Sequence, residues 1–212
     1  MGILRLAHVD VTVTDLDLAT AYYTEVIGLQ ETERDADSVY LKCWDEPNHH
    51  SLRLIYGPRV GFEQMSFRVE HEDDLSRFEN RVQQWGYPVR RVSKGEHVGQ
   101  GESIRFETPS GQQMELVHDL TMVGRATSRI NPAPFVEGLK GIAPPRLDHV
   151  LVTVEDLAAS GAHICDDAPG RRGFTGSARD GVSSGLEAVE RQPPALLPAA
   201  GQLGVGPVVL VE

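Results

Sequence analysis

A twelve-residue segment near the start of the chain recurs late in the sequence, and this repeat constrains the architecture more than any other feature. Residues 5–16 read RLAHVDVTVTDL and residues 146–157 read RLDHVLVTVEDL, with nine of twelve positions identical. Each copy places one histidine, His8 or His149, in a run of β-branched residues that leads into an Asp-Leu helix start. Such a repeat indicates that the chain is built from copies of one structural module.

The residues after the first copy predict the order strand, helix, strand, strand, strand. Alternating apolar residues predict a first strand that carries His8 and Asp10 on one face. Asp15 is a suitable N-cap for the helix, and Gly28 is suited to end it. The predicted elements are strands at 6–13, 30–33, 39–44 and 51–56 and a helix at 15–27.

The same order then repeats, which predicts an α+β domain of two βαβββ modules over residues 1–120. The elements of the second module are a strand at 64–70, a helix that starts at 71–74, and strands at 89–92, 103–108 and 113–117. The apolar positions of both modules predict a core that contains Leu6, Val11, Tyr23, Val26, Leu41, Phe67, Leu75, Phe78, Trp85, Phe106 and Leu116.

The composition changes after residue 120. Residues 121–145 are rich in Pro, Gly and Ala, so we expect a linker, and 146–160 start a second, catalytic-type domain. We expect that domain to be incomplete, because residues 161–212 hold nine Gly, five Pro and no Lys, Tyr or Trp. Such a segment buries little apolar surface and is expected to be irregular. It is either a natural tail or the product of a shifted reading frame.

Charge and composition exclude some classes of partner. Against 31 acidic side chains there are only 20 basic ones, a formal net charge of −11, which argues against a nucleic-acid surface. No apolar run approaches the ~20 residues of a membrane helix, and the first residues lack the pattern of a secretory leader. Cys43 and Cys165 lie far apart and form no metal or redox motif. We expect a cytoplasmic protein with neither nucleic-acid nor membrane partners.

Six short stretches carry a resemblance to a known family. They are LAHV at 6–9, VYLKCW at 39–44, RFETPSG at 105–111, NP at 131–132, GLKG at 138–141 and RLDH at 146–149. In this order and spacing they resemble the extradiol ring-cleaving dioxygenases of the catechol 2,3-dioxygenase type, in the vicinal oxygen chelate superfamily, over about residues 4–157. The resemblance implies that the paired βαβββ modules form a curved half-open barrel and that the protein is a homo-oligomer.

The resemblance also implies an iron-dependent oxygenase. In that family two modules form an N-terminal domain and two more form the catalytic domain, where two histidines and one glutamate hold Fe(II). Such a facial ligand set leaves positions open for a small aromatic diol and O2. By resemblance His149 is the first iron ligand, and the implied reaction converts catechol and O2 to 2-hydroxymuconate semialdehyde in aromatic-compound catabolism.

The first copy indicates where the other two ligands belong. If His8 corresponds to His149, the family pattern puts the next equivalent positions at Gln64 and Glu115. The same separations after His149 fall near positions 205 and 256, but position 205 is Val205 and the sequence has 212 residues. We therefore expect a truncated form without ring-cleavage activity, in which the family's catalytic residues have no counterpart.

His8, Gln64 and Glu115 form the copy of the iron site in the first two modules. One interpretation is a degenerate cavity filled by hydrogen-bonded side chains, and the other is a weak metal site. Two further functions stay open: a non-catalytic module that binds a small molecule or pairs with other subunits, and a glyoxalase-like metalloenzyme that uses this N-terminal site. His49 and His50 lie in a polar loop and are expected to be solvated.

Overall fold

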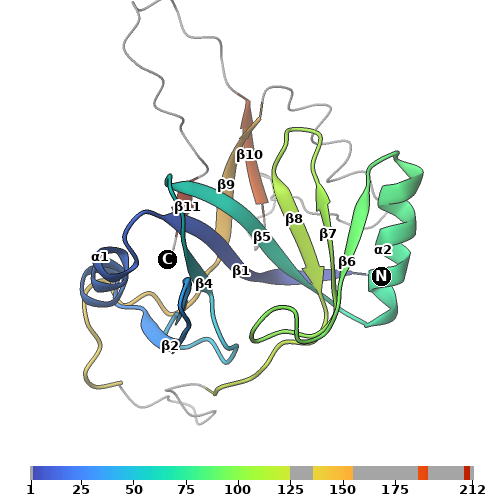
Figure 1. The fold of residues 1–212 in the computed structure, drawn as a ribbon. Helices are drawn as coiled ribbons and strands as arrows, with labels where there is room; N and C mark the ends of the chain where they lie inside the picture. The colour runs from blue at the N-terminus through green and yellow to red at the C-terminus, as the bar shows by residue number, and fades with distance from the viewer. Residues whose placement is uncertain (1, 125–135, 155–185, 191–207, 211–212) are drawn as a thin grey trace, which may run out of the picture.

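The structure, a computed structural model, describes residues 2–124, 136–154, 186–190 and 208–210 (Figure 1). No helix within these ranges is long and apolar enough to span a membrane. The elements in chain order are β1 (Ile3–Val13), α1 (Leu16–Ala21), η1 (Tyr22–Ile27), β2 (Gln30–Arg34), β3 (Ser38–Lys42), β4 (Leu52–Tyr56), β5 (Gly61–Val69), α2 (Asp73–Gln84), β6 (Val89–Val92), β7 (Ser103–Glu107), β8 (Gln113–Val117), β9 (His149–Val154), β10 (Leu186–Glu190) and β11 (Val208–Leu210).

The main sheet has eight strands and consists of two βαβββ units joined at their first strands. In the first unit β1 pairs in parallel with β4, and β3 and β2 follow outward; in the second, β5 pairs in parallel with β8, followed by β7 and β6. β1 and β5 pair antiparallel at the centre, with Val9 opposite Met65. This arrangement confirms the predicted α+β fold of paired modules, and Figure 1 shows that the sheet is strongly curved.

The first helix differs from its prediction in its second half. Asp15 caps the helix as expected, because its carboxylate accepts a hydrogen bond from the backbone N–H of Leu18 at 2.9 Å. From Tyr22 to Ile27, however, the backbone is a π-helix, in which the N–H of Gly28 donates to the carbonyl of Tyr23, five residues earlier. Each π turn holds more residues than an α turn, so the face that packs on the sheet shifts along the sequence.

Most residues predicted in the core are found there. Two of the predictions are wrong, because Val26 is 49% exposed and Trp85 is 38% exposed. The π-helix turns Val26 outward and leaves Ile27 on the core side, and Trp85 follows the last residue of α2, beside Arg81. The buried predicted residues are Leu6, Leu41, Phe67, Leu75 and Leu116, and those that pack partly buried against them are Val11, Tyr23, Phe78 and Phe106.

A bulge in β1 gives this strand an apolar side and a polar side that simple alternation does not predict. Opposite β5 the register shifts between Leu6 and His8, so that Ala7 is an extra residue. Leu6 and Val9 therefore both enter the apolar core, although they are three residues apart. His8 and Asp10 are two residues apart and lie together on the other face of the sheet, as strand alternation predicts.

The segment 136–147, which includes part of the predicted linker, packs against the end of η1. The backbone N–H of Ile142 donates to the carbonyl of Val26 at 3.0 Å, and that of Ala143 donates to the carbonyl of Ile27 at 2.9 Å. These bonds attach the segment to the first module, so we refer to residues 136–147 as the strap.

Two glycines allow the strap to approach the helix end this closely. A Cβ atom at Gly28 would lie 2.0 Å from the carbonyl oxygen of Lys140, and one at Gly141 would lie 2.0 Å from that of Val26. Both glycines also have positive φ angles, which glycine adopts at little cost. Residues 125–135, the rest of the predicted linker apart from 121–124, lie outside the described residues.

The second sequence copy starts a further sheet with the same local order. β9 pairs in parallel with β10 and antiparallel with β11, as β1 does with β4 and β5. Leu147 and Val150 are buried in the same core cluster as Leu6 and Val9, their counterparts in the repeat. We expected 161–212 to be irregular, and this expectation is wrong at β10 and β11. These short strands are defined by their pairing with β9, and amino-acid composition does not reveal such pairing. The rest of that segment lies outside the described residues.

Cys43 is an inert thiol in this fold. It is 1% exposed, and burial raises the pKa of Cys43 from 9.0 to about 12 because the thiolate loses its hydration. Its folded-state pKa lies above the unfolded value, so its contribution to stability is present below about pH 9 and is lost as the pH rises towards 12.

We expect iodoacetamide to alkylate Cys43 in the native protein at pH 8 about 1,000-fold more slowly than in the urea-unfolded protein, as the difference in thiolate population dictates. Mass spectrometry of a Cys165→Ser variant follows this single thiol. Equal labelling rates in the native and unfolded protein would contradict the assignment of a buried thiol.

Candidate functional site

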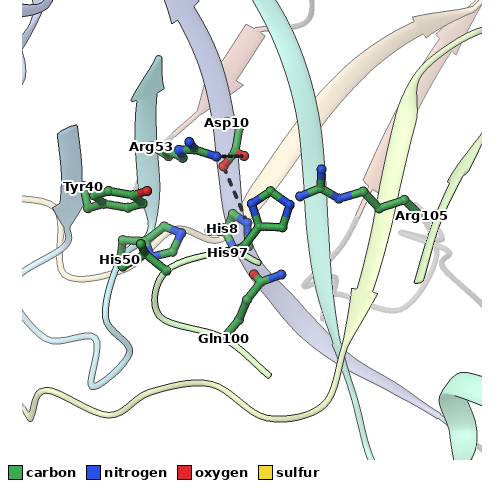
Figure 2. Close-up of a pocket in the computed structure, with 9 residues that line it drawn as sticks. His8, Asp10, Tyr40, His50, Arg53, His97, Gln100 and Arg105 are labelled. Atoms are coloured by element: carbon green, nitrogen blue, oxygen red, sulfur yellow. Dashed lines mark ion pairs between the residues drawn. The ribbon is translucent and has the colours of Figure 1, made fainter. Parts of the chain in front are cut away.

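Polar side chains from both modules meet on the face of the sheet opposite the apolar core. They line a small cavity, in which β1 supplies His8 and β7 supplies Arg105. Figure 2 shows Tyr40 and His50 on one side of His8 and Arg105 on the other. The residues that line the cavity are His8, Asp10, Tyr40, His50, Arg53, His97, Val98, Gln100 and Arg105.

The structure brings together the three residues that the sequence predicted for the N-terminal site. His8 Nε2 lies 3.6 Å from Glu115 Oε2. Gln64 lies on β5, across from Asp10, and its Nε2 donates a hydrogen bond to Asp10 Oδ2 at 3.0 Å. Gln64 therefore fixes a carboxylate of the cluster, while His8 and Glu115 face each other directly.

Asp10 and His50 belong to the same cluster, and neither was predicted as a site residue. Asp10 follows His8 by two residues, so it lies on the same face of β1, and its Oδ1 is 3.5 Å from His8 Nε2. The expectation that His49 and His50 are solvated is wrong, because they are 7% and 4% exposed. Strand alternation could have identified Asp10, whereas no local signal identifies His50.

The loop that carries His50 is buried by a segment far away in sequence. The N–H of His49 donates to the carbonyl of Thr121 at 2.9 Å, and the N–H of Val123 donates to that of Pro47 at 2.8 Å. Lys42, itself buried, donates to the carbonyl of Gly124 at 2.8 Å. These contacts close the loop over the cavity.

A row of histidines connects the cavity with the protein surface. His49 Nε2 lies 3.1 Å from Oε2 of the half-exposed Glu33, and its Nδ1 lies 3.0 Å from His50 Nδ1. The rings of His50 and His8 follow at a centroid distance of 4.5 Å. Because His50 Nδ1 contacts His49 Nδ1, the other ring nitrogen of His50, Nε2, is the one that remains to face the cavity.

Burial keeps the imidazoles of the cavity neutral. It lowers the pKa of His8 from 6.5 to about 3, with smaller contributions in the same direction from Arg105 and Arg53. The pKa of His50 is lowered well below its ordinary value, first by burial and then by His8. Burial raises the pKa of Asp10 to about 7, against the opposing effect of Arg53. Each neutral imidazole has a nitrogen lone pair that can bind a metal ion or accept a proton.

Glu115 is the most heavily hydrogen-bonded carboxylate of the site. Its Oε1 accepts hydrogen bonds from Ser103 Oγ at 2.8 Å, Arg105 Nε at 2.9 Å and Gln100 Nε2 at 3.0 Å, and the side chain is fully buried. All three donors come from β7 or the loop before it. Glu115 therefore holds the second module's half of the site together.

Three other buried atoms of the site have no hydrogen-bond partner among the described residues: Asp10 Oδ1, Glu115 Oε2 and His97 Nε2. Buried polar atoms are nearly always paired, so these atoms indicate a missing small partner. The space open to the centre of a water-sized particle is about 10 Å3, which suits a single water or metal ion.

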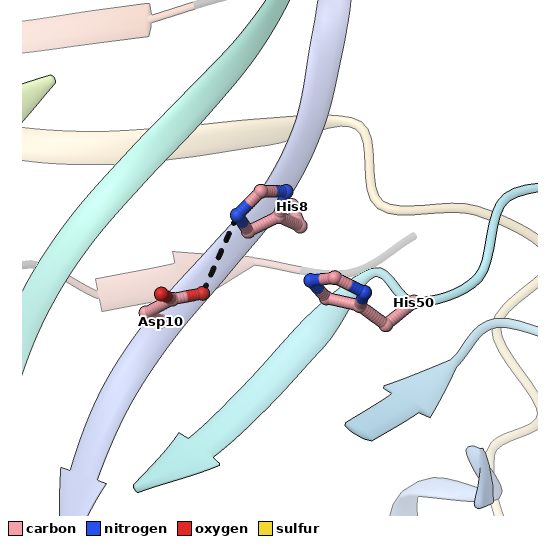
Figure 3. A group of neighbouring side chains, drawn as sticks. All are labelled: His8, Asp10 and His50. Atoms are coloured by element: carbon pink, nitrogen blue, oxygen red, sulfur yellow. Dashed lines mark ion pairs between the residues drawn. The ribbon is translucent and has the colours of Figure 1, made fainter. Parts of the chain in front are cut away.

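One group of three side chains in the described ranges has potential metal-binding atoms close enough to share an ion. It consists of His8, Asp10 and His50, whose ligand atoms all lie within 4.8 Å of one another (Figure 3). Figure 3 shows both imidazoles beside the Asp10 carboxylate, with His8 and Asp10 on β1 and His50 on the loop before β4. Two imidazoles and one carboxylate form a common donor set for transition metals.

His149, the iron ligand implied by resemblance, belongs to no such group in the part of the chain that the structure describes. On β11, Val208 lies opposite Leu151. Leu151 is the counterpart of Asp10 in the sequence repeat, and Asp10 lies opposite Gln64 in the first module. By strand register, Val208 and not Val205 is therefore the counterpart of Gln64, and valine is not a metal-binding residue type.

A second, larger cavity of about 300 Å3 lies between η1, β4 and the strap. It has no charged side chain, so it suits an apolar molecule. Its lining residues are Tyr22, Tyr23, Ile27, Leu29, Cys43, Ser51, Leu52, Ile142, Pro144 and Leu147.

Comparison with known proteins agrees with the fold and with the sequence resemblance. Residues 62–121 match the family described as the catechol 2,3-dioxygenase-like N-terminal domain. A metapyrocatechase from Pseudomonas sp. strain CF600 is 36% identical over 161 residues, which are 75% of this chain and 52% of that protein. A manganese-dependent 2,3-dihydroxybiphenyl 1,2-dioxygenase from Geobacillus genomosp. 3 is 29% identical over 71% of this chain and 48% of its own length.

Solved structures show the same relationship. The 2,3-dioxygenase LapB from Pseudomonas sp. KL28 has a TM-score of 0.71 and 36% identity, and the match covers 76% of this chain and 57% of that one. The homoprotocatechuate 2,3-dioxygenase of Brevibacterium fuscum, in its complex with 3,4-dihydroxyphenylacetate, has a TM-score of 0.65 and 31% identity over 74% of this chain and 47% of that one. The chain thus spans about half the length of the relatives that it matches.

Proposed function

We propose that this chain belongs to the extradiol dioxygenase family and supplies the N-terminal domain of a catechol-type ring-cleaving enzyme. The observation that carries the proposal is the joined pair of βαβββ modules, with β1 and β5 at the centre of one sheet, of which the second module, within residues 62–121, matches the N-terminal domain of such enzymes. The second sequence copy, on β9, supports the start of a further module in the same chain.

For the complete enzyme, we propose a small aromatic diol and O2 as substrates and Fe(II) as cofactor, in a homo-oligomer. The reaction inserts both oxygen atoms of O2 into catechol and opens the ring next to the hydroxyl pair, which gives 2-hydroxymuconate semialdehyde. A structural relative in complex with 3,4-dihydroxyphenylacetate and a relative named as manganese-dependent support a diol substrate and a divalent metal.

The described residues do not fit an iron site at His149. His149 Nδ1 lies 3.2 Å from Asp148 Oδ2, and His149 is not part of a group of three potential metal ligands in the described ranges. We therefore propose that this polypeptide alone does not cleave catechol and that its described domain has a structural or binding role.

We expect no yellow ring-fission product when the purified chain is loaded anaerobically with Fe(II) and then given catechol and O2. A metapyrocatechase assayed in parallel serves as the positive control, and iron content is measured on the same sample. Turnover that His149→Ala abolishes would show that residues outside the described ranges complete an iron site, and it would refute the proposal of inactivity.

A further inference from the structure

We propose that His8, His50 and Asp10 form a binding site for one divalent transition-metal ion in the N-terminal domain, separate from the iron position implied at His149. This inference does not rest on ring cleavage, because it concerns side chains of the first module only. Zinc and cobalt are the ions that suit two imidazoles and one carboxylate in a small buried cavity.

The spacing of the donor atoms favours an ion over direct hydrogen bonds. His8 Nε2 lies 3.5 Å from Asp10 Oδ1 and 3.6 Å from Glu115 Oε2, which is too long for good hydrogen bonds. Neighbouring ligands of a tetrahedral zinc ion, with bonds of about 2.0–2.1 Å, lie about 3.4 Å apart. The His8–Asp10 separation matches this value, and the ligand atom of His50 lies within 4.8 Å of both.

The carboxylate oxygens that face His8 are the ones without partners. Asp10 Oδ1 and Glu115 Oε2 are buried and accept no hydrogen bond from the described residues, although the other oxygen of each carboxylate does. A buried carboxylate oxygen without a donor is unfavourable. A metal ion between them would bind Asp10 directly, and Glu115 would accept a hydrogen bond from a water on the ion.

Outer contacts hold the proposed ligands in the orientation that metal binding needs. His50 Nδ1 is engaged by His49, which in turn contacts Glu33, so that a carboxylate and an imidazole orient the ligand ring. Asp10 Oδ2 accepts a hydrogen bond from Gln64. Metal-binding histidines and carboxylates are usually held by outer partners of this kind.

Two guanidinium groups limit the affinity. Arg53 Nη1 lies 3.8 Å from Asp10 Oδ2, and Arg105 Nε lies 2.9 Å from Glu115 Oε1, so both carboxylates are already partly neutralised. A bound dication would therefore add buried positive charge. We expect weaker binding than at a closed structural zinc site, and we expect the ion to retain a water or hydroxide ligand.

The test is a titration of chelator-treated full-length protein with Co(II) and Zn(II). We expect one equivalent of Co(II) to give visible d–d absorption and Zn(II) to displace it, with the affinity reduced more than about 10-fold in His50→Gln and in Asp10→Asn. His71→Gln removes an exposed histidine far from the cluster and should leave the affinity unchanged. No saturable binding, or equal affinity in all four proteins, would overturn the proposal.

Two further measurements separate this site from the proposed function and from misfolding. Loss of Co(II) binding in His149→Ala, with binding retained in His50→Gln, would place the ion at the family's iron position and overturn the inference. In the wild-type protein, Zn(II) should shift the ring ¹⁵N resonances of two histidines, one of which His50→Gln assigns to His50. That readout stands even if one variant fails to fold.

Discussion

Glu115→Ala should lower the free energy of unfolding by about 3–5 kcal/mol, because it breaks a buried charge pair and leaves its partners uncompensated. The carboxylate oxygen Oε1 accepts hydrogen bonds from Gln100, Ser103 and Arg105, all within 3.0 Å, and the side chain is fully buried. After truncation the guanidinium of Arg105 faces a cavity without its counter-charge. Urea denaturation followed by tryptophan fluorescence, with chelator present, measures the loss.

Gln113→Ala is the matched control, since Gln113 lies two residues earlier on β8 but is exposed. It loses only a surface contact with Glu107, so its effect should stay within about 0.5 kcal/mol. Glu115→Gln keeps an oxygen acceptor without the charge and should fall between the two alanine variants. Losses of similar size in Glu115→Ala and Gln113→Ala would show that the network contributes nothing to stability.

Gly28→Ala should lower the free energy of unfolding by about 3 kcal/mol, from two sources. Gly28 has a φ angle of 90°, where an L-residue is strained by about 1–2 kcal/mol. The added methyl would also lie 2.0 Å from the carbonyl oxygen of Lys140, and such overpacking costs about 1–3 kcal/mol. The variant should release the strap, which limited proteolysis would detect as faster cleavage within residues 136–147.

Gly86→Ala separates the two sources. Its φ angle of 87° imposes nearly the same backbone strain, but no atom lies within 4 Å of the position of the added methyl. We expect this variant to lose about 1–2 kcal/mol without a change in the proteolysis of the strap. Identical stabilities and digestion patterns for the two variants would mean that the strap is not tightly packed on η1.

The sequence predicted the architecture well because local chemistry and the repeat agree there. Strand alternation, the Asp15 cap and the glycine stop defined the first module, and the repeated order defined the second. His8, Gln64 and Glu115 could be assigned to one site because of the family resemblance, and the structure has them on the neighbouring strands β1, β5 and β8. Periodicity predicts the strands themselves but does not predict which of them pair.

The features that the sequence did not predict depend on contacts between distant segments or on local irregularities. His50 is buried because residues 121–124 cover its loop, and nothing around His50 itself indicates that. Val26 is exposed because Tyr22–Ile27 form a π-helix, which shares its residue preferences with an ordinary helix. The bulge at Ala7 likewise cannot be recognised from the composition, although it puts Leu6 on the same side of β1 as Val9.

The position of β1 in the sheet also has a consequence for how the protein is made. β1 is synthesised before both of its partner strands, because Val9 pairs with Leu52 on one side and with Met65 on the other. Both edges of an apolar strand therefore stay open in the nascent chain until β4 and β5 have emerged, and such edges promote aggregation. The first module alone leaves one edge of β1 unpaired, and this edge is covered only after β5 has been synthesised.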